Sequence, residues 1–419
     1  MHIKLRLTIM QFFQLFLWGA WLITFGAYAF NTLKFTGAQI GAIYGTMGIA
    51  SIFMPGITGI IADRWVNAER VYGMLHIFGG IMLFIASQVT DANALYWIML
   101  LNSMVYMPTL AMSNTVAYSI LEKKGYNIIT DYPPIRVWGT VGFIVAMWMT
   151  SLFKWELSAA QLYIGSISAT CLGFYSFTLP ACRPCNTGEK RTLFNSLGLN
   201  ALVLFKRRKM AVFFFFAMLL GAALQITNTF GDAFLHDFAA NPEYKDTLGV
   251  RYPAILMSIS QMSETLFILT IPYFLRKFGI KTVMLISMIA LVFRFGLFGF
   301  GNPGDGLWLL VLSMIVYGCA FDFFNISGSL FVEMEADPTI RASSQGLFMM
   351  VTNGFGAYIG AQGSGLVIDS LTTMVGGAPS RDWHNIWLVF ASYVLVTLLL
   401  FIPLFRYKHD PKKLENFHH

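Results

Sequence analysis

The chain has 419 residues, of which 56% are apolar and only 12% are charged, and its formal net charge is +7. Because soluble domains carry about 25% charged residues, this composition excludes a soluble enzyme, a disordered protein and a nucleic-acid-binding protein. The apolar segments are long and continuous, which predicts membrane helices and argues against an outer-membrane barrel, whose strands alternate in polarity. Lys and Arg in cytoplasmic loops then explain the positive charge.

Twelve membrane spans can be drawn along the chain, each with about 20 mainly apolar residues. They cover roughly residues 9–30, 38–61, 71–90, 94–120, 134–153, 158–180, 210–232, 253–275, 281–300, 307–331, 341–368 and 384–405. The first is longer than the apolar region of a cleaved signal peptide, so we interpret it as a membrane helix. The breaks between spans carry turn residues and charges, for example Thr90-Asp91-Ala92-Asn93.

Lys and Arg are distributed unevenly between the two sets of loops. If both termini face the cytoplasm, 21 of the 28 lie on the cytoplasmic side and 5 on the opposite side, which favours this orientation. The longest cytoplasmic connection falls at the midpoint of the chain. The sequence therefore predicts an all-α integral membrane protein with two six-helix bundles, 1–180 and 210–405, a cytoplasmic linker, 181–209, and a cytoplasmic tail, 406–419.

A charged motif ends the second span. The stretch Gly59-Ile60-Ile61-Ala62-Asp63-Arg64 resembles the Gly-x-x-x-Asp-Arg signature of the major facilitator superfamily. A charge cluster at a helix end can hold neighbouring helices in one of two states, as alternating access requires. We therefore predict that Asp63 and Arg64 form a conformational gate. The alternative is an ordinary positively charged turn on the cytoplasmic side.

Ionisable residues inside membrane spans are costly and are therefore candidates for function. The candidates inside the predicted spans, away from the span ends, are Arg136, Glu264, Arg294 and Asp322. The two acids suit proton coupling, whereas the alternative is a fixed structural ion pair, for example with Arg136. For Arg294 we favour a structural role, because the superfamily resemblance places span nine outside the cavity. Asp232, at the outer end of span seven, is expected to meet water.

Polar and aromatic side chains accompany these charges at helical spacing. Four spans each present such a group on one face: Arg136 and Thr140 with Phe143; Gln225 and Asn228; Gln261 and Glu264; Tyr317 and Phe321 with Asp322 beside them. One polar group can join two helices, but four groups with aromatic rings are better explained by a ligand cavity. The expected ligand is neutral and polyhydroxylated, and both a sugar and a nucleoside fit this description.

Several stretches resemble the bacterial nucleoside permeases of the nucleoside:proton symporter family, including its xanthosine permease branch. They are 131–140, 224–228, 260–264, 312–328 and 340–346, and the resemblance extends over nearly the whole chain. It implies proton-driven import of purine and pyrimidine nucleosides across the inner membrane. It implies proton coupling by Asp322 and Glu264, and substrate binding by Arg136, Thr140, Phe143, Gln225, Asn228, Gln261, Glu264, Tyr317 and Phe321.

The predicted protein is thus a multi-pass transporter of the bacterial inner membrane, with both termini cytoplasmic. We expect a monomer that binds a nucleoside and a proton, contacts lipid, and uses no cofactor, metal or nucleic acid. The alternative function is a major facilitator carrier for another neutral polar solute, such as a sugar. A membrane enzyme is disfavoured because Gly-x-Ser-x-Gly and His-Glu-x-x-His are absent. A metal or redox role for Cys182 and Cys185 is the less favoured interpretation, since no second pair lies nearby.

Overall fold

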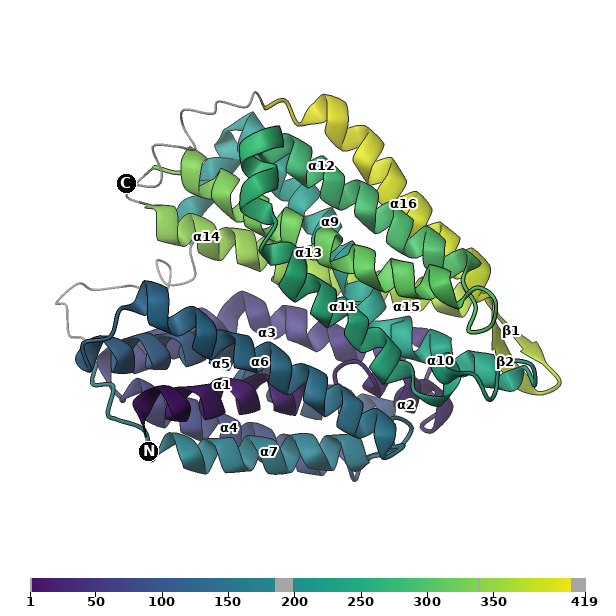
Figure 1. The fold of residues 1–419 in the computed structure, drawn as a ribbon, viewed down its shortest axis with the longest axis horizontal. Coiled ribbons are helices and arrows are strands. Elements are labelled where there is room, and N and C mark those ends of the chain that lie inside the picture. The colour runs from purple at the N-terminus through teal and green to yellow at the C-terminus, as the bar shows by residue number, and fades with distance from the viewer. Residues whose placement is uncertain (1, 185–198, 338–339, 408–419) are drawn as a thin grey trace. The chain divides into compact units, whose positions relative to one another are not determined.

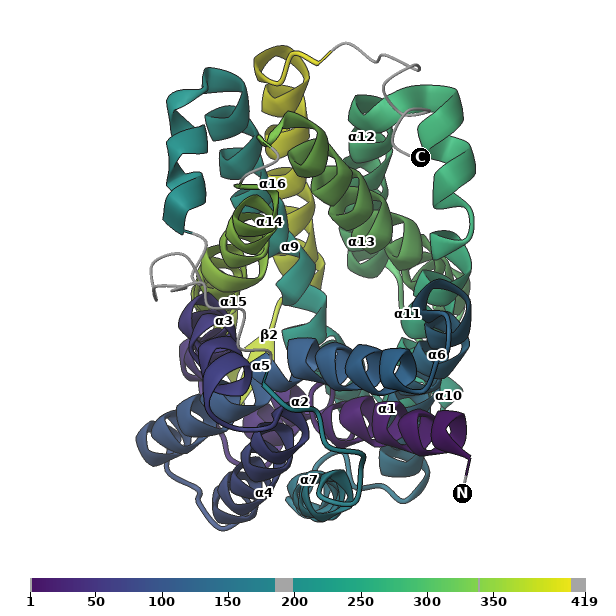
Figure 2. The same ribbon diagram turned by 90° about the vertical axis from the view of Figure 1, so that its left-hand side faces the viewer.

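The computed structural model describes residues 2–184, 199–337 and 340–407, and most of them are helical (Figure 1, Figure 2). The backbone contacts divide the chain into two compact units. Unit 1 comprises Met1–Leu197 together with Asn228–Ala233, and unit 2 comprises Gly198–Thr227 together with Phe234–His419.

Helices joined by short connections build unit 1. They are α1 (Ile3–Gly19), α2 (Phe25–Asn31), α3 (Gly37–Arg64), α4 (Ala68–Ala86), α5 (Ala92–Lys123), α6 (Ile128–Leu152) and α7 (Ala160–Ser176). Within the unit α1 packs along α6, α4 along α7, and α3 along α5 (Figure 1). The predicted first span, 9–30, is interrupted by a turn and contains most of α1 and nearly all of α2.

The described part of unit 2 contains helices, a π-helical turn and a β-hairpin. They are η1 (Leu199–Lys206), α9 (Arg208–Asp237), η2 (Phe238–Ala240), α10 (Leu248–Arg251), α11 (Pro253–Ile268), α12 (Ile271–Phe300), α13 (Leu307–Glu335), α14 (Arg341–Met349), η4 (Met350–Gly356), α15 (Ala357–Ser370), β1 (Thr372–Val375), β2 (Ala378–Arg381) and α16 (Trp383–Leu404). The unit includes all of α9 except Asn228–Ala233, which belong to unit 1. Within unit 2 α12 packs along α13 and α16, and α11 along α13 (Figure 1). The backbone of α12 leaves the helical conformation at Gly279, where the sequence predicts a loop.

Eight helices of the described residues are long and apolar enough to cross a membrane. They are Gly37–Arg64, Ala68–Ala86, Ala92–Lys123, Thr130–Leu152, Arg208–Ala240, Ile271–Phe300, Leu307–Glu335 and Trp383–Leu404. Helix is present within each of the predicted spans, and the number of twelve crossings stays a prediction.

Side-chain caps start several helices at the turn residues of the sequence. At the beginning of α5, the carboxylate of Asp91 accepts a hydrogen bond of 2.8 Å from the backbone amide of Ala94. Thr36 and Gln39 form a capping box at the beginning of α3, in which each side chain accepts a hydrogen bond from the backbone amide of the other residue. These bonds satisfy amides that the helix itself leaves open, so the chain can turn sharply between long helices.

The β-hairpin before α16 was not predicted. Its two-residue turn consists of Gly376 and Gly377, both with positive φ, as a tight hairpin turn requires. Arg381, the last residue of β2, forms a salt bridge of 2.8 Å with Asp237, and the indole of Trp383, at the start of α16, donates to the same carboxylate at 2.7 Å. The hairpin connection is therefore fixed to the end of α9.

A buried polar cluster joins the helices of unit 1. The side-chain amide of Gln14 in α1 donates to the hydroxyl of Thr109 in α5 at 3.0 Å, and its oxygen lies 3.0 Å from Nε2 of His76 in α4. The hydroxyl of Tyr106 donates to the backbone carbonyl of Gln14 at 2.9 Å. Lipid cannot supply such bonds, so these side chains hold α1, α4 and α5 together.

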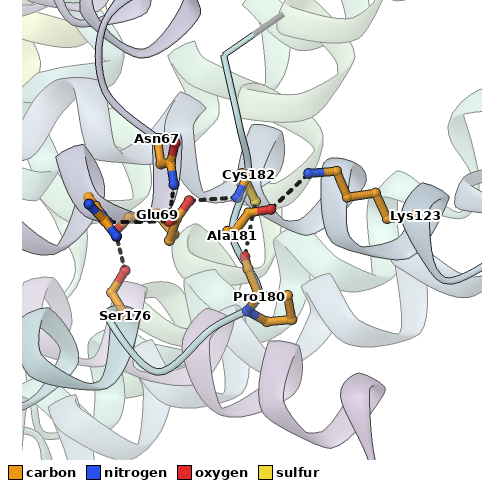
Figure 3. A network of polar contacts seen from close by, with 8 residues as sticks. Asn67, Glu69, Lys123, Ser176, Pro180, Ala181 and Cys182 are labelled. Atoms are coloured by element: carbon orange, nitrogen blue, oxygen red, sulfur yellow. Dashed lines mark hydrogen bonds and ion pairs between the residues drawn. The ribbon is translucent and has the colours of Figure 1, made fainter.

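The segment after α7 is anchored to the ends of α4 and α5 (Figure 3). The backbone amide of Cys182 donates to the carboxylate of Glu69 at 2.7 Å, and Nζ of Lys123 donates to the carbonyl of Ala181 at 2.7 Å. Asn67 donates to the second oxygen of Glu69 at 3.1 Å. Glu69 is only 3% exposed, so water does not compete for these bonds. The predicted linker thus begins with a fixed segment.

The thiol of Cys182 faces this anchor. Its Sγ lies 3.5 Å from the carbonyl oxygen of Pro180 and 3.9 Å from that of Val116. Burial raises the pKa of the Cys182 thiol, which keeps it protonated and weakly reactive. Cys185, the second cysteine of the Cys-x-x-Cys motif, lies outside the described residues.

Replacing Glu69 with alanine should release this segment and expose Cys182. The change removes the acceptor of a buried amide, and a hydrogen bond to a charged group contributes about 1.5–3 kcal/mol, so local opening should rise roughly 10- to 100-fold. The measurement is the rate of maleimide labelling in a chain whose Cys171, Cys185 and Cys319 are replaced by serine. Glu69→Gln keeps an acceptor oxygen and should label slowly. Equal rates for Glu69→Ala and its parent would show that Glu69 is not the anchor.

Candidate functional site

Two helices of unit 2, α11 and α13, approach each other closely beside the predicted substrate residues. A Cβ added to Gly318 would lie 2.6 Å from the carbonyl carbon of Ser263 and 2.7 Å from the amide nitrogen of Glu264. The hydroxyl of Ser263 also donates to the carbonyl of Ile315. This contact holds the backbone of α11 at Glu264 against the turn of α13 that carries Tyr317.

Tyr317 and Phe321 form an aromatic pair one turn apart on α13. Their ring centroids are 5.6 Å apart, and the ring planes meet at 28°. Tyr317 is 2% exposed, whereas Phe321 is half-buried. The guanidinium carbon of Arg294 lies 4.1 Å from the centroid of the Tyr317 ring. Phe321, the more exposed member of the pair, offers a flat apolar ring of the kind against which a base or the face of a sugar can pack.

The predicted proton-coupling acids lie on the same two helices. Asp322 on α13 is 4% exposed, and its Oδ2 has no hydrogen-bond partner among the residues that the structure describes. Glu264 on α11 is half-buried, and its charge acts on Asp322 through space. Gln261, one turn before Glu264, is half-buried too. Unit 2 therefore brings together Gln261, Glu264, Tyr317, Phe321 and Asp322 on two packed helices.

Gln225 and Asn228 lie on α9, three residues apart. The spacing places them on one face of the helix, roughly 4.5 Å apart along its axis. Both are half-buried, whereas Leu224, Ile226 and Thr227 around them are buried. The predicted pair is therefore present as two half-buried amides among buried neighbours on α9.

The residues predicted in span five lie along α6 of unit 1. This helix begins at Ile128, six residues before the predicted start, and continues through Pro133 and Pro134. Because an α-helix rises 1.5 Å per residue, Arg136 lies roughly 12 Å from the first residue of the helix, whereas the predicted span 134–153 places it two residues after the start. The predicted start at 134 was wrong, because the prolines and Asp131 hide the first turns of the helix from a hydropathy pattern.

Phe143 is fixed by close packing between α1 and α6. It is 6% exposed, its ring meets Trp18 edge to face at a centroid distance of 6.2 Å, and a Cβ on Gly19 would lie 2.6 Å from its carbonyl oxygen. Arg136 and Thr140 on the same helix are half-buried. Among the described residues no salt bridge joins Arg136 to an acid, so the structural ion pair considered from the sequence is not observed there.

Asp232 is buried, contrary to the expectation that it meets water. Its side chain is 0% exposed, and a carboxylate oxygen of Glu156 lies within 4.8 Å. The expectation was wrong because α9 continues to Asp237, five residues beyond the predicted end of span seven. Hydropathy marks where apolar residues stop, whereas backbone hydrogen bonds carry the helix further.

Asp63 and Arg64 occupy the last two positions of α3, and both are exposed. The predicted gate requires its charges at the end of a helix, and both residues lie there. Their role as a conformational gate stays a prediction.

The whole chain resembles a known transporter family. The family model described as nucleoside H+ symporter matches residues 1–410. The chain belongs to this family. It is 55% identical to xanthosine permease of Escherichia coli (strain K12) over 99% of both chains. It is 52% identical to nucleoside permease NupG of the same organism, over 98% of this chain and 97% of the relative.

A solved structure supports the same assignment. The crystal structure of an aspartate-to-alanine variant of nucleoside transporter NupG matches with a TM-score of 0.94 and 51% identity, over 97% of this chain and all of that chain. The fold is therefore that of a helical, multi-pass membrane transporter of the major facilitator type. The resemblance stated from the sequence is confirmed.

Gly318→Ala should strongly reduce nucleoside uptake. The added methyl group would meet the backbone of α11 at Ser263 and Glu264, and overpacking of this kind costs about 1–3 kcal/mol. We expect uptake to fall roughly 5- to 150-fold when corrected for the amount of protein in the membrane. Gly296→Ala is the matched control, because nothing lies within 4 Å of a Cβ at that position. Normal uptake by Gly318→Ala would contradict the close-contact argument.

Proposed function

We propose that this chain imports purine and pyrimidine nucleosides together with protons across the bacterial inner membrane by alternating access. The observation that carries the proposal is the family match over residues 1–410, with relatives named xanthosine permease and nucleoside permease. These relatives are transporters rather than enzymes. The half-buried amides and the aromatic pair in the predicted spans support a neutral ligand with hydroxyl groups and a flat ring.

Each substrate residue has a proposed task. Gln261 and Glu264 on α11 form hydrogen bonds with the ribose hydroxyls. Gln225 and Asn228 on α9 form hydrogen bonds with the edges of the base. The rings of Phe143, Tyr317 and Phe321 enclose the base and the sugar, while Arg136 and Thr140 complete the set. The helical spacing and partial burial of the polar members support this division.

Asp322 and Glu264 are the proposed proton-coupling acids. They lie on two packed helices, Asp322 is almost fully buried, and the two charges act on each other. A proton on either acid removes the repulsion between two carboxylates. Proton binding can therefore be linked to the change of state that closes the carrier around its substrate.

The proposed architecture has twelve membrane helices in two six-helix bundles, 1–180 and 210–405, with a cytoplasmic linker, 181–209, and tail, 406–419. The presence of helix within each predicted span and the excess of Lys and Arg in one set of loops support it. Both termini face the cytoplasm, and the carrier acts as a monomer surrounded by lipid. Asp63 and Arg64 act as the cytoplasmic gate.

Uptake of labelled uridine and xanthosine should collapse when a protonophore is added. The measurement uses cells that lack their own nucleoside carriers, with and without this protein, and sugars as competitors. Loss of uptake with the protonophore is expected because the proton gradient drives accumulation. Persistent accumulation would exclude proton coupling, and competition by a sugar but not by uridine would favour the sugar carrier instead.

Glu264→Gln and Asp322→Asn should separate binding from coupling. The variant of the obligatory proton carrier should lose accumulation but keep nucleoside exchange between the two sides, because its neutral side chain mimics the protonated acid. Purified protein in vesicles, with labelled uridine and an imposed pH gradient, gives both rates. Glu243→Gln, at an exposed acid, is the control. If accumulation survives in both variants, neither acid is the obligatory carrier.

A further inference from the structure

Arg294 is a charged side chain for which the proposed transport mechanism has no task. It lies on α12, is 1% exposed and is among the largest fully buried side chains. Every partner that it has among the described residues is neutral: the Thr227 and Ser260 hydroxyls, the Ser313 carbonyl and the rings of Phe298 and Tyr317.

A buried guanidinium without a carboxylate is costly, so its surroundings must compensate for the lost water. Three hydrogen bonds, of 3.3 Å to Thr227, 3.4 Å to Ser260 and 3.1 Å to Ser313, do part of this. The ring of Tyr317 adds a cation–π contact, with 4.1 Å between the guanidinium carbon and the ring centroid, and the ring of Phe298 lies at 5.3 Å. An apolar residue could fill the same space without the free-energy cost of burying a charge. The presence of an arginine here therefore points to a functional role.

The partners of Arg294 lie beside the predicted substrate residues. Thr227 is two positions after Gln225 on α9, and Ser260 directly precedes Gln261 on α11. On α13 the guanidinium touches the substrate residue itself, Tyr317. One side chain therefore joins the three helices of unit 2 on which the polar and aromatic candidates stand.

We propose that Arg294 is a positioning residue for nucleoside binding. It fixes the ring plane of Tyr317 and holds α9, α11 and α13 at the spacing that the substrate contacts need. The inference rests on the proposed function, because it assigns the role of Arg294 through Tyr317 and its neighbours. It replaces the purely structural role that the sequence favoured for Arg294.

Arg294→Lys tests the geometry while it keeps the charge. A lysine has no flat group to cover the Tyr317 ring and cannot donate in three fixed directions, so the exchange is not conservative here. We expect KM for labelled uridine or xanthosine to rise about tenfold, with the maximal rate within about twofold of wild type. The melting temperature of the purified protein should gain less from added nucleoside than wild type does. Arg276→Lys, at an exposed arginine of the same helix, should leave KM unchanged.

A double-mutant cycle separates positioning from general destabilisation. If Arg294 acts through the ring, Arg294→Lys should add little to the effect of Tyr317→Leu, whereas independent roles would add. Thr227→Val and Ser260→Ala remove one hydrogen-bond partner each and keep Arg294, so they remain informative if Arg294→Lys does not reach the membrane. Each should raise KM about two- to fivefold.

The outcomes distinguish this inference from the proposed function. If wild-type protein transports neither uridine nor xanthosine, the proposed function fails. If wild type transports a nucleoside and KM is unchanged in Arg294→Lys, only the positioning role is overturned. If Arg294→Lys is not produced, an unchanged KM in both Thr227→Val and Ser260→Ala overturns it instead. Additive effects in the cycle with Tyr317→Leu would overturn it as well.

Discussion

A polar side chain in a membrane helix must find its partners inside the protein, because lipid offers none. Both units of this chain are organised around that requirement. In unit 1, Gln14 binds groups from α4 and α5, and in unit 2 Arg294 binds groups from α9, α11 and α13. In each unit a polar or charged residue joins several helices and lies next to a tyrosine. The helices that carry the candidate substrate residues of unit 2 are held at their spacing by these bonds and by the small residues that let backbones touch.

The two units use different chemistry for this purpose. In unit 1 the cluster around Gln14 consists of neutral partners and His76, whose ring lies 6.3 Å from that of Tyr106. In unit 2 the residue beside Tyr317 that joins the helices carries a charged guanidinium. An arginine holds its charge whatever the protonation of its neighbours, and its flat group matches a ring face. It therefore suits a unit in which nearby acids are proposed to change their proton occupancy.

The helices could largely be predicted from the sequence, whereas several features of the site could not. Hydropathy and caps such as Asp91 locate helix in every predicted span. The earlier start of α6 and the continuation of α9 beyond Asp232 escape a hydropathy pattern, because the helical backbone includes prolines and acids that such a pattern assigns to loops. The hairpin at Gly376 and Gly377 was missed although its turn signal is present.

The contacts of Arg294 depend on which helices surround it. The pattern of residues within α12 does not predict these neighbours. The same contacts bear on proton coupling. A fixed ion pair would hold a carboxylate in its charged form, but Arg294 directs its donors to two hydroxyls and a carbonyl and its face to Tyr317. Among the described residues no salt bridge joins Asp322 to this cation. In the proposed mechanism a charge that serves geometry alone leaves the neighbouring acids able to bind and release protons, so the proposed substrate binding and proton coupling can share unit 2.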